Sequence, residues 1–373
     1  MADMPDTDPA PRRRAGSDWI VNLARSRRFQ AFAARVPGLR WVARRQGEAI
    51  FKTIQGFVES QVLMALVELG LLHRLESGPA KPGDLAPGLG LPEDRLAVLL
   101  QAGAAAGLLR RRRDGRFALS VRGASLLAVP GLEGMILHHA ILYRDLADPV
   151  AFLRGETRPD LAEFWPYVFG AGAAEDPGRA TRYSRLMAES QVLVAEDTLA
   201  LADLRGVRSM MDVGGGTGAF LEALGRHHPG IERHLFELPA VLDGAGARLG
   251  QGVRLHPGSF RDDPLPPGAD AISLVRVLYD HSDDTVRALL ARVHAALPPG
   301  GLVLVSEPMS GGMRPDPVTD VYFAFYTMAM RTGRTRSAAR IAELLGEAGF
   351  DRIAPARSRR PFVTSLVTAR RPA

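Results

Sequence analysis

The stretch SMMDVGGGTGAF, residues 209–220, decides the fold of the second half of this chain. A short apolar run stops at a group of glycines and apolar residues resume after it, which is typical of a buried strand that turns directly into a helix. Glycines at such a turn let a ligand approach the backbone without meeting a Cβ atom. Gly214, Gly216 and Ala219 fit a relaxed G-x-G-x-x-A dinucleotide pattern, which is weak evidence when taken alone.

Glu237 strengthens this pattern. It lies 23 residues after Gly214 (237 − 214), at the end of the next predicted strand. A carboxylate there accepts hydrogen bonds from both ribose hydroxyls of a nucleoside, whether the cofactor is NAD or S-adenosylmethionine. We therefore predict a nucleoside-containing cofactor at this loop. Asp212, two residues before the first glycine, either orients the loop or reaches a cationic part of the ligand.

Strands and helices alternate from about residue 204 onward. The predicted strands of this part are residues 209–213, 232–237, 253–256, 270–277 and 301–306. Two further strands, near 351–357 and 362–369, lie too close together for a helical crossover, so we expect them to pair as an antiparallel hairpin. The sequence thus predicts an α/β, Rossmann-like domain over residues 201–373, with a C-terminal hairpin that is unlike the usual nicotinamide-binding domain.

Residues 18–200 are predicted to form a mainly helical domain. Residues 56–72 place apolar side chains on one helical face, and residues 84–127 predict two short helices followed by a hairpin that turns at Asp114-Gly115. This order is a winged-helix arrangement. Arg110–Arg113 beside it are compatible with DNA binding, but some enzymes use the same module for dimerisation. We favour dimerisation, because the apolar helix before the module predicts a large contact with a partner chain.

The composition excludes several classes of function. The chain has no cysteine, so disulfides, thiolate metal sites and cysteine nucleophiles are excluded, and we predict no metal site. We find no membrane span and no secretory segment in the sequence, and therefore expect a cytoplasmic protein. Residues 11–45 hold ten arginines and one acid, Asp18, within a net charge of +6. This basic arm, whose first residues belong to a leader (1–17) expected to be disordered, is either solvated or in contact with an anionic membrane.

Several motifs in order resemble the S-adenosylmethionine-dependent O-methyltransferases that carry a winged-helix dimerisation domain. DVGGGTG (212–218) resembles the family's first motif, and Glu237-Leu238-Pro239 resembles its D-L-P. The resemblance runs from about Gly56 to Arg370. It implies a class I methyltransferase domain, S-adenosyl-L-methionine as the cofactor, a homodimer, and no binding of nucleic acid. The cofactor-binding residues that it implies are Met187, Asp212, Gly214, Gly216, Glu237, Leu238, Ser259, Phe260 and Arg276.

The chain departs from the family pattern at two places that bear on chemistry. Ser259 stands where the family has an aspartate near the adenine, which weakens the contact expected there. Tyr279 stands at the position of the catalytic histidine of the plant relatives, and His281 at that of a tryptophan. A tyrosine with its ordinary pKa of about 10 is a poor base at neutral pH, although it can orient a hydroxyl. We predict Tyr279, His281 and Glu307, the acid that ends the fifth strand, as catalytic residues.

The segments 137–156, 163–172, 274–284 and 332–337 resemble more particularly the bacterial carotenoid O-methyltransferases. The resemblance implies a very apolar acceptor with a tertiary 1-hydroxyl, as in hydroxyneurosporene and demethylspheroidene of spheroidene biosynthesis. Residues 321–330 agree with it, because VYFAFYTMAM is rich in aromatic residues and methionine. The predicted acceptor-binding residues are His138, His139, Tyr326 and Met330.

Three alternatives remain open at this point. The acceptor could be a bacteriochlorophyll precursor, a polyketide or a phenol, since the cofactor motifs do not distinguish them. A winged-helix regulator that only senses a ligand would also carry these motifs, and the loss of the family's histidine at Tyr279 favours it mildly. A nicotinamide oxidoreductase is the last alternative.

Overall fold

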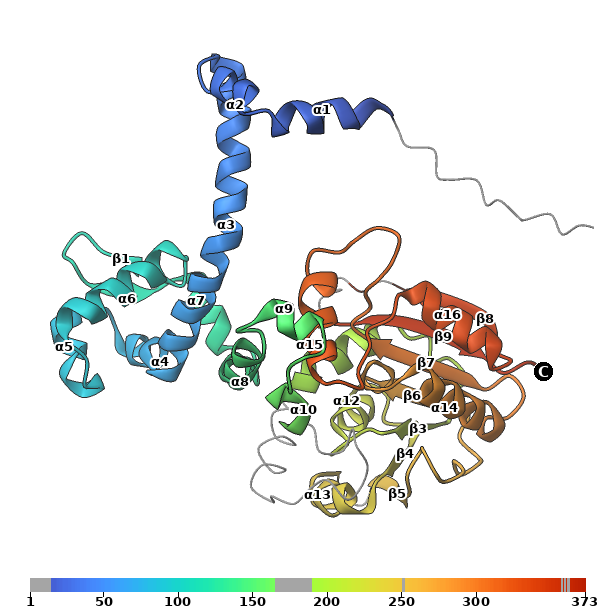
Figure 1. The fold of residues 1–373 in the computed structure, drawn as a ribbon. Helices are drawn as coiled ribbons and strands as arrows, with labels where there is room; N and C mark the ends of the chain where they lie inside the picture. Colours follow the sequence, from blue (N-terminus) through green and yellow to red (C-terminus); the bar gives the residue numbers. More distant parts are fainter. Residues whose placement is uncertain (1–14, 165–189, 250–251, 357, 359, 361–362) are drawn as a thin grey trace, which may run out of the picture. The chain divides into compact units, whose positions relative to one another are not determined.

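The computed structural model describes residues 15–164, 190–249, 252–356, 358, 360 and 363–373. The chain forms two compact units, Met1–Gly123 and Ala124–Ala373 (Figure 1). The helices between Gly123 and residue 200, which the sequence assigns to the first domain, belong by their contacts to the second unit. Each unit is described by itself below.

The first unit begins with helices. They are α1 (Ala15–Arg25), α2 (Arg27–Ala33), α3 (Pro37–Glu68), α4 (Leu71–Arg74), α5 (Pro82–Leu85) and α6 (Glu93–Ala105), with short 3-10 turns at Leu75–Ser77 and Pro87–Leu89. α1 starts inside the leader that was expected to be disordered, and residues 1–14 lie outside the described residues. Pro37 opens α3, since its missing N–H costs nothing in the first helical turn.

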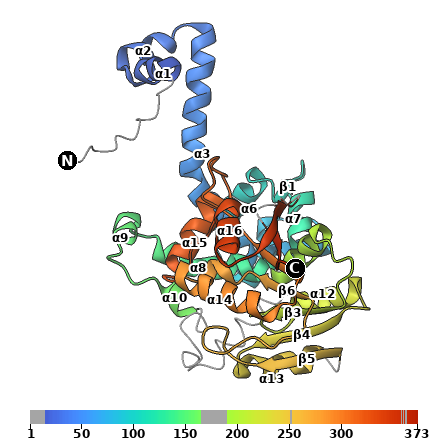
Figure 2. The same cartoon turned by 90° about the vertical axis from the view of Figure 1, so that its right-hand side faces the viewer.

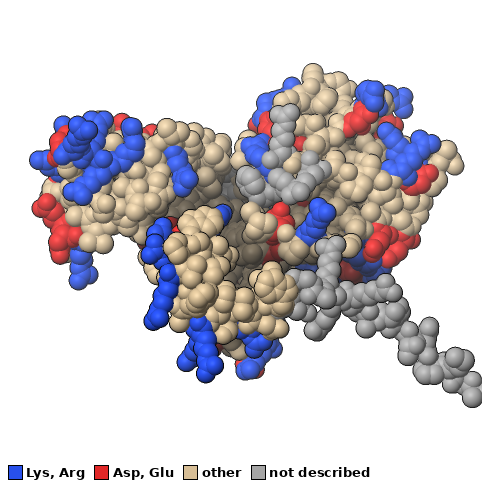
Figure 3. All heavy atoms as spheres, turned by 90° about the horizontal axis from the view of Figure 1, so that it is seen from above, with Lys and Arg blue, Asp and Glu red and all other residues tan. Residues whose placement is uncertain are grey.

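α3 leaves an apolar stripe uncovered in the single chain. Ile50, Phe51, Ile54, Phe57 and Val58 recur at helical spacing and are each more than half exposed. By length and composition this helix could cross a membrane: an 18-residue window has a mean hydropathy of 1.2, and 17% of that window is buried. An exposed stripe of this size marks an interaction surface. Figure 3 shows basic side chains of the N-terminal helices bordering uncharged surface.

The predicted winged-helix hairpin is present after α6. β1 (Leu109–Arg111) pairs antiparallel with β2 (Phe117–Leu119). The turn lies at Asp114-Gly115 as expected: Gly115 has a φ of 81°, and the Asp114 carboxylate accepts a hydrogen bond of 3.1 Å from the Arg116 N–H. Phe117 also bridges to Ala80, which ties the hairpin to the segment before α5.

The second unit is built on one mixed sheet of seven strands. The strands are β3 (Ser209–Val213), β4 (Glu232–Glu237), β5 (Val253–Pro257), β6 (Ala271–Val275), β7 (Leu302–Glu307), β8 (Asp351–Ala356) and β9 (Ser365–Arg370). Their order is β5-β4-β3-β6-β7-β9-β8. β3 to β7 pair in parallel, whereas β9 is antiparallel to both β7 and β8. The predicted parallel sheet with a C-terminal antiparallel hairpin is confirmed.

Helices cover both faces of this sheet (Figures 1 and 2). α12 (Ala219–His227), α13 (Pro239–Leu249) and residues 190–201 share one core with the sheet, which includes Met210. α14 (Asp283–Ala296) and α16 (Ala338–Glu347) share the opposite core, which includes Met211. Successive residues of β3 thus enter opposite cores, because side chains alternate along a strand. This double burial explains why the central strands are apolar throughout.

Further helices of the second unit form a small apolar cluster of their own. They are α8 (Leu132–Asp145), α9 (Pro149–Leu153), α10 (Asp160–Phe164), a π-helical turn (Thr319–Phe323) and α15 (Ala324–Ala329). α7 (Val121–Leu127), which spans the division between the units, precedes them in the chain. Leu142, Phe152, Leu161 and Tyr326 are buried together here. The buried Asp145 carboxylate fastens α8 to α10, because it accepts the N–H groups of Asp160 and Leu161 at 2.7 and 3.0 Å.

Candidate active site

The predicted cofactor residues follow neighbouring strands at one edge of the sheet. Gly214 comes directly after β3, Glu237 ends β4, Ser259 follows β5 and Arg276 follows β6. Because these four strands are parallel and adjacent, their carboxyl ends meet at the same edge. Ligands of open α/β sheets bind there, where the strand order reverses. The reversal in this sheet lies between β3 and β6.

The loop after β3 has the backbone that only glycine adopts without strain. Gly214, Gly216 and Gly218 have φ values of 69°, 57° and 81°. A Cβ on Gly215 would lie 2.2 Å from a carboxyl oxygen of Asp212, whereas a Cβ on Gly216 would meet nothing within 4 Å. The loop therefore packs closely against Asp212 at Gly215, whereas the space next to the Gly216 backbone is open. This is the backbone cradle that a nucleoside cofactor needs.

The Glu237 carboxylate lies against this loop. Its Oε2 accepts a hydrogen bond of 2.9 Å from the Gly216 N–H, and its Oε1 accepts one of 2.8 Å from the Leu238 N–H. Burial raises the pKa of Glu237, and the two backbone N–H groups counteract part of that rise. Carboxylate and bare backbone stand next to each other, as the sequence predicted. Both therefore fit the ribose and the adjoining part of S-adenosylmethionine.

Asp212 supports the loop from inside. It is fully buried, and its Oδ1 accepts a hydrogen bond of 2.6 Å from the Ser273 hydroxyl. Its Oδ2 has no hydrogen-bonding partner among the residues that the structure describes. Burial raises the pKa of Asp212 to about 7; the Ser273 hydrogen bond lowers it, and the Glu237 charge adds to the rise. This position favours orienting the loop over reaching the ligand directly.

The residues after β5 show how the chain accommodates serine in place of the family's aspartate. The Ser259 hydroxyl donates to an Asp262 carboxyl oxygen at 2.9 Å, and the Ser259 N–H donates to Asp263 at 2.8 Å. The family's aspartate at this position is thus replaced by a serine that is hydrogen-bonded to two carboxylates, those of Asp262 and Asp263. The Phe260 ring lies 3.4 Å from where a Cβ of Gly214 would be, so it borders the glycine loop as predicted.

Arg276 is directed toward Tyr279. It has a φ of 58°, a strained value for a residue other than glycine. Its Nε donates to the Tyr279 hydroxyl at 3.2 Å, and its Nη1 donates to the Ser190 hydroxyl at 3.0 Å. Met187, which was also predicted to contact the cofactor, lies outside the described residues.

Tyr279 is held in a short 3-10 turn, Leu278–Asp280, by the buried Glu307. The Tyr279 N–H donates to Glu307 Oε2 at 3.0 Å. Burial raises the pKa of Glu307 to about 7, against the opposing charge of Arg336 and the N–H groups of Tyr279 and Leu278. Burial likewise raises the pKa of the Tyr279 phenol above its usual value, although Arg276 opposes this. The Tyr279 phenol therefore stays protonated at neutral pH, which suits it to hydrogen bonding and not to the role of a base.

The contacts of His281 lie with the segment after β5. Arg261 approaches its Nδ1 at 3.0 Å, and the Phe260 ring meets it edge to face at a centroid distance of 5.2 Å. Burial lowers the pKa of His281 to about 3, and the charges of Arg261 and Arg336 add to this. The imidazole is therefore uncharged at neutral pH and borders Phe260 on the predicted adenine side.

The structure brings the four predicted acceptor residues together. His138 Nε2 lies 2.8 Å from the Tyr326 hydroxyl, and the His139 ring stacks on Tyr322 at 5.3 Å. Met330 is buried in the same apolar cluster as Tyr326. Burial lowers the pKa of His138 to about 4, so this pair is uncharged at neutral pH. Tyr322 was not singled out from the sequence, although its i, i+4 spacing to Tyr326 would have revealed it.

The acceptor cluster and the turn of Tyr279 meet at Gly333. A Cβ on Gly333 would lie 2.9 Å from the Thr327 carbonyl oxygen in α15 and 3.0 Å from that of Tyr279. Glycine thus lets the two elements close on each other. The neighbouring Asp280 was missed by the sequence analysis. Its Oδ1 is buried without a hydrogen-bonding partner among the described residues, and burial raises the pKa of its carboxyl well above the usual range, although Arg276 opposes this rise.

Comparisons with known proteins agree with this geometry. The O-methyltransferase domain matches residues 143–351, and the O-methyltransferase dimerisation domain matches residues 51–128. The demethylspheroidene O-methyltransferase of Cereibacter sphaeroides is 62% identical over 94% of both chains. That of Rhodobacter capsulatus is 54% identical over 97% of this chain and 92% of its own length. CalO1, a methyltransferase in calicheamicin biosynthesis in its SAH-bound form, has a TM-score of 0.73 at 25% identity and covers 88% of this chain and 98% of its own.

The sheet, the glycine loop and its carboxylate define a class I methyltransferase that uses S-adenosylmethionine. Within this class, the chain belongs to the O-methyltransferase family that carries its own dimerisation domain. That domain supports a homodimer, and its matched residues include Phe51, Ile54, Phe57 and Val58 of the exposed stripe of α3. The family excludes the nicotinamide oxidoreductase and the ligand-sensing regulator.

Proposed function

We propose that this O-methyltransferase acts on the tertiary 1-hydroxyl of acyclic hydroxycarotenoids, with demethylspheroidene and hydroxyneurosporene as acceptors, in spheroidene biosynthesis. The observation that carries the proposal is the 62% identity, over 94% of both chains, with the demethylspheroidene O-methyltransferase of Cereibacter sphaeroides. The identity with the Rhodobacter capsulatus relative of the same name, 54%, supports the same acceptor.

The predicted acceptor residues have the chemistry that such a molecule requires. A carotenoid chain is apolar along its length and carries one hydroxyl near its end. The cluster around Tyr326 and Met330 is apolar and aromatic, with one uncharged polar pair, His138 and Tyr326. Apolar walls with a few polar groups are typical of small-molecule sites. An uncharged polar pair also suits a neutral alcohol better than a charged group would.

S-Adenosylmethionine, when bound, supplies an electrophilic methyl group on a positively charged sulfur. The residues that would hold it are the glycine loop at Gly214–Gly218, Glu237 at the ribose and Phe260 beside the adenine. Placing the acceptor oxygen in line with that methyl group supplies most of the catalysis, since fixed proximity is worth roughly 7–11 kcal/mol of a barrier. Tyr279 and its neighbours would orient the hydroxyl.

We infer that Asp280 takes the proton. Tyr279 is a hydrogen-bond acceptor for Arg276 with a raised pKa, and His281 is turned toward Phe260 and Arg261 with a lowered pKa. Asp280 has a buried carboxyl oxygen without a described partner, and its raised pKa makes it a stronger base once ionised. A tertiary alcohol is very weakly acidic, so Asp280 would take the proton while the oxygen–methyl bond forms and the carbon–sulfur bond breaks, with S-adenosylhomocysteine as the leaving group.

The test is a methyl-transfer assay with the purified full chain, labelled S-adenosylmethionine and detergent-dispersed carotenoids. We expect label in demethylspheroidene and none in the same carotenoid without its 1-hydroxyl. Label in a phenol or polyketide but not in demethylspheroidene would overturn the acceptor. Asp280→Asn should lower kcat by about 10²–10⁴-fold while the affinity for S-adenosylhomocysteine is retained. Full activity of this variant would remove Asp280 as the base.

We further propose that the N-terminal helices rest on an anionic membrane surface and make the enzyme a peripheral protein of the cytoplasmic or photosynthetic membrane. Trp19, Ile20 and Trp41 are each more than half exposed, and the helices that carry them, α1 and α3, also carry arginines of the basic arm. Apolar rings beside basic residues bind anionic bilayers through both burial and charge. An acceptor that dissolves in lipid would be reached from such a position.

Liposome sedimentation tests the membrane contact. We expect the full chain to sediment with vesicles that contain anionic lipid and to stay in solution with neutral vesicles or at high salt. The double variant Trp19→Ser, Trp41→Ser should bind more weakly than the wild type. Equal sedimentation of wild type and variant, or equal binding to neutral lipid, would contradict the proposal.

A further inference from the structure

The turn that carries Tyr279 is held by hydrogen bonds from a separate segment, Thr332–Arg336, to its backbone carbonyl groups. The Thr332 hydroxyl donates to the carbonyl oxygen of Asp280 at 3.0 Å, and the Arg334 N–H donates to that of Tyr279 at 2.7 Å. The Arg336 guanidinium donates to the carbonyl oxygens of Leu278 and His281. Each of the four successive carbonyl groups of residues 278–281 therefore has its partner in this one segment, which we call the clamp.

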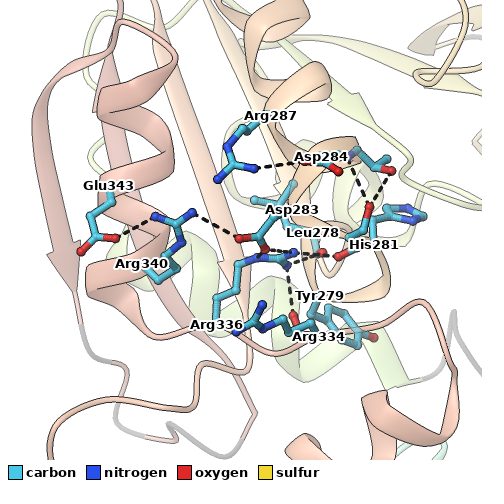
Figure 4. Close-up of polar contacts among 12 residues, drawn as sticks. Leu278, Tyr279, His281, Asp283, Asp284, Arg287, Arg334, Arg336, Arg340 and Glu343 are labelled. Carbon is cyan, nitrogen blue, oxygen red and sulfur yellow. Dashed lines mark hydrogen bonds and ion pairs between the residues drawn. The ribbon is translucent and has the colours of Figure 1, made fainter. Parts of the chain in front are cut away.

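Arg336 is the centre of the clamp (Figure 4). Its side chain is only 1% exposed. Nη1 lies 2.8 Å from the Leu278 oxygen and Nη2 lies 2.7 Å from the His281 oxygen, so one planar group spans the turn from end to end. Binding both carbonyl oxygens at once depends on the planar guanidinium group of arginine, which carries several N–H donors. The single ammonium group of lysine does not hold two separated carbonyls in one plane.

The charge of Arg336 is balanced by Asp283, the first residue of α14. Asp283 Oδ1 accepts from both Nε and Nη2 of Arg336, at 2.9 and 2.8 Å. The acid also lies in the first turn of a helix, where a negative charge is favoured. The guanidinium is thus fixed on one side to the start of α14 and on the other to the turn. Breaking a buried, paired group of this kind would release the turn from its support.

The clamp also adjoins the predicted acceptor residues. It follows directly after Met330 and α15, and the Gly333 backbone passes between the carbonyl oxygens of Thr327 and Tyr279. The segment therefore connects α15 directly with the turn of Tyr279 and Asp280. Both the predicted acceptor residues and the turn of Tyr279 thus adjoin the same short segment.

We propose that Arg336 is a positioning residue for methyl transfer, which holds the turn 278–281 in the one conformation that aims Tyr279 and Asp280 at the acceptor hydroxyl. It does so through two backbone carbonyls and touches neither reactant. The proposal rests on the proposed function only for the choice of acceptor in the assay. Misplacing reacting groups by about 1 Å costs roughly 10²-fold in rate.

The decisive variant is Arg336→Lys, and the matched control is Arg340→Lys. Arg340 also pairs with Asp283, at 3.2 Å, but its other partners are Glu343 and Glu347 at the surface, and it contacts no carbonyl of the turn. We expect Arg336→Lys to lower kcat by about 10²-fold per S-adenosylhomocysteine-binding site, with KM for the cofactor changed little. Arg340→Lys should remain within a few-fold of the wild type.

A hydrogen-exchange measurement separates positioning from general destabilisation and needs no acceptor. In Arg336→Lys the peptide that covers residues 276–284 should exchange faster than in the wild type, while peptides from β3 and β4 keep their protection. If the wild type methylates only some other acceptor, the proposed function fails, and the same pair of variants is then compared with that acceptor.

The proposal is overturned by wild-type kcat in Arg336→Lys, by an equal loss in Arg340→Lys, or by unchanged exchange at residues 276–284. Should Arg336→Lys not fold, Thr332→Val removes only the hydrogen bond to the Asp280 carbonyl. It should lower kcat several-fold without loss of cofactor binding. Wild-type turnover in that variant would equally contradict a positioning role for the clamp.

Discussion

Replacing Glu237 by alanine tests the cofactor site most directly. In the structure one oxygen of this carboxylate accepts a hydrogen bond of 2.9 Å from Gly216 in the glycine loop, and the other accepts one of 2.8 Å from the adjacent Leu238. Bound to S-adenosylhomocysteine, the carboxylate would accept from two ribose hydroxyls. Hydrogen bonds to a charged group contribute about 1.5–3 kcal/mol each, so two of them sum to about 3–6 kcal/mol. With about 1.4 kcal/mol per tenfold in Kd, Glu237→Ala should weaken binding by about 10²–10⁴-fold.

Isothermal titration with S-adenosylhomocysteine measures this change. Glu237→Gln is the control of matched size, because it retains one acceptor oxygen and should fall between the wild type and the alanine variant. A thermal melt of each variant is needed as well, since alanine also leaves the N–H groups of Gly216 and Leu238 without this partner. A Kd of Glu237→Ala within threefold of the wild type would refute the assignment of this carboxylate to the ribose.

Three further outcomes are expected. Because the folded-state pKa of Asp212 is raised to about 7 from 3.8, the folded state binds the extra proton and the wild type loses stability as pH rises from about 4 to 7. In urea melts, the free energy of unfolding of Asp212→Asn should therefore rise relative to that of the wild type over that range. A difference in free energy that does not change with pH would contradict burial as the cause of the raised pKa. His281→Asn should leave the apparent pKa values of the kcat/KM profile between pH 6 and 8 unchanged, since His281 is already uncharged there. If the variant lost the acidic or the basic side of this pH profile, His281 would be identified as the base. The double variant Ile54→Asp, Phe57→Asp should shift the protein toward monomer in light scattering. These side chains are exposed in the single chain, and each one that a dimer interface buries contributes about 1.5–3 kcal/mol to association. An intact dimer would place the interface elsewhere.

Local patterns predicted the catalytic domain well. The strands at 209–213 and 232–237 are found with the predicted bounds, and the C-terminal hairpin is present. Each of these depends on burial and turn chemistry within a few residues, which a single sequence carries. The resemblance to the family correctly indicated the activity, the cofactor and the dimerisation domain.

The roles of the predicted catalytic residues depended on contacts that no local pattern contains. Tyr279 and His281 are two residues apart, yet their side chains contact different groups, Arg276 in one case and Arg261 in the other. Glu307 supports the turn through a backbone N–H. The sequence predicted Tyr279, His281 and Glu307 as catalytic residues, whereas the structure draws attention to Asp280, which lies between the first two. Burial and neighbouring charge set these pKa values, and both are properties of the folded chain.

The sequence by itself determined the order of strands and helices, the glycine turn after β3 and the carboxylate 23 residues further on, because strand burial, turn geometry and helix periodicity act over short distances. Only the tertiary structure placed His138 against Tyr326, 188 residues away, and set Arg336 across the turn of Tyr279. Such pairs form when packed elements bring distant side chains together and exclude water from them. The geometry of the reacting groups is therefore decided by packing, after local interactions have specified the elements.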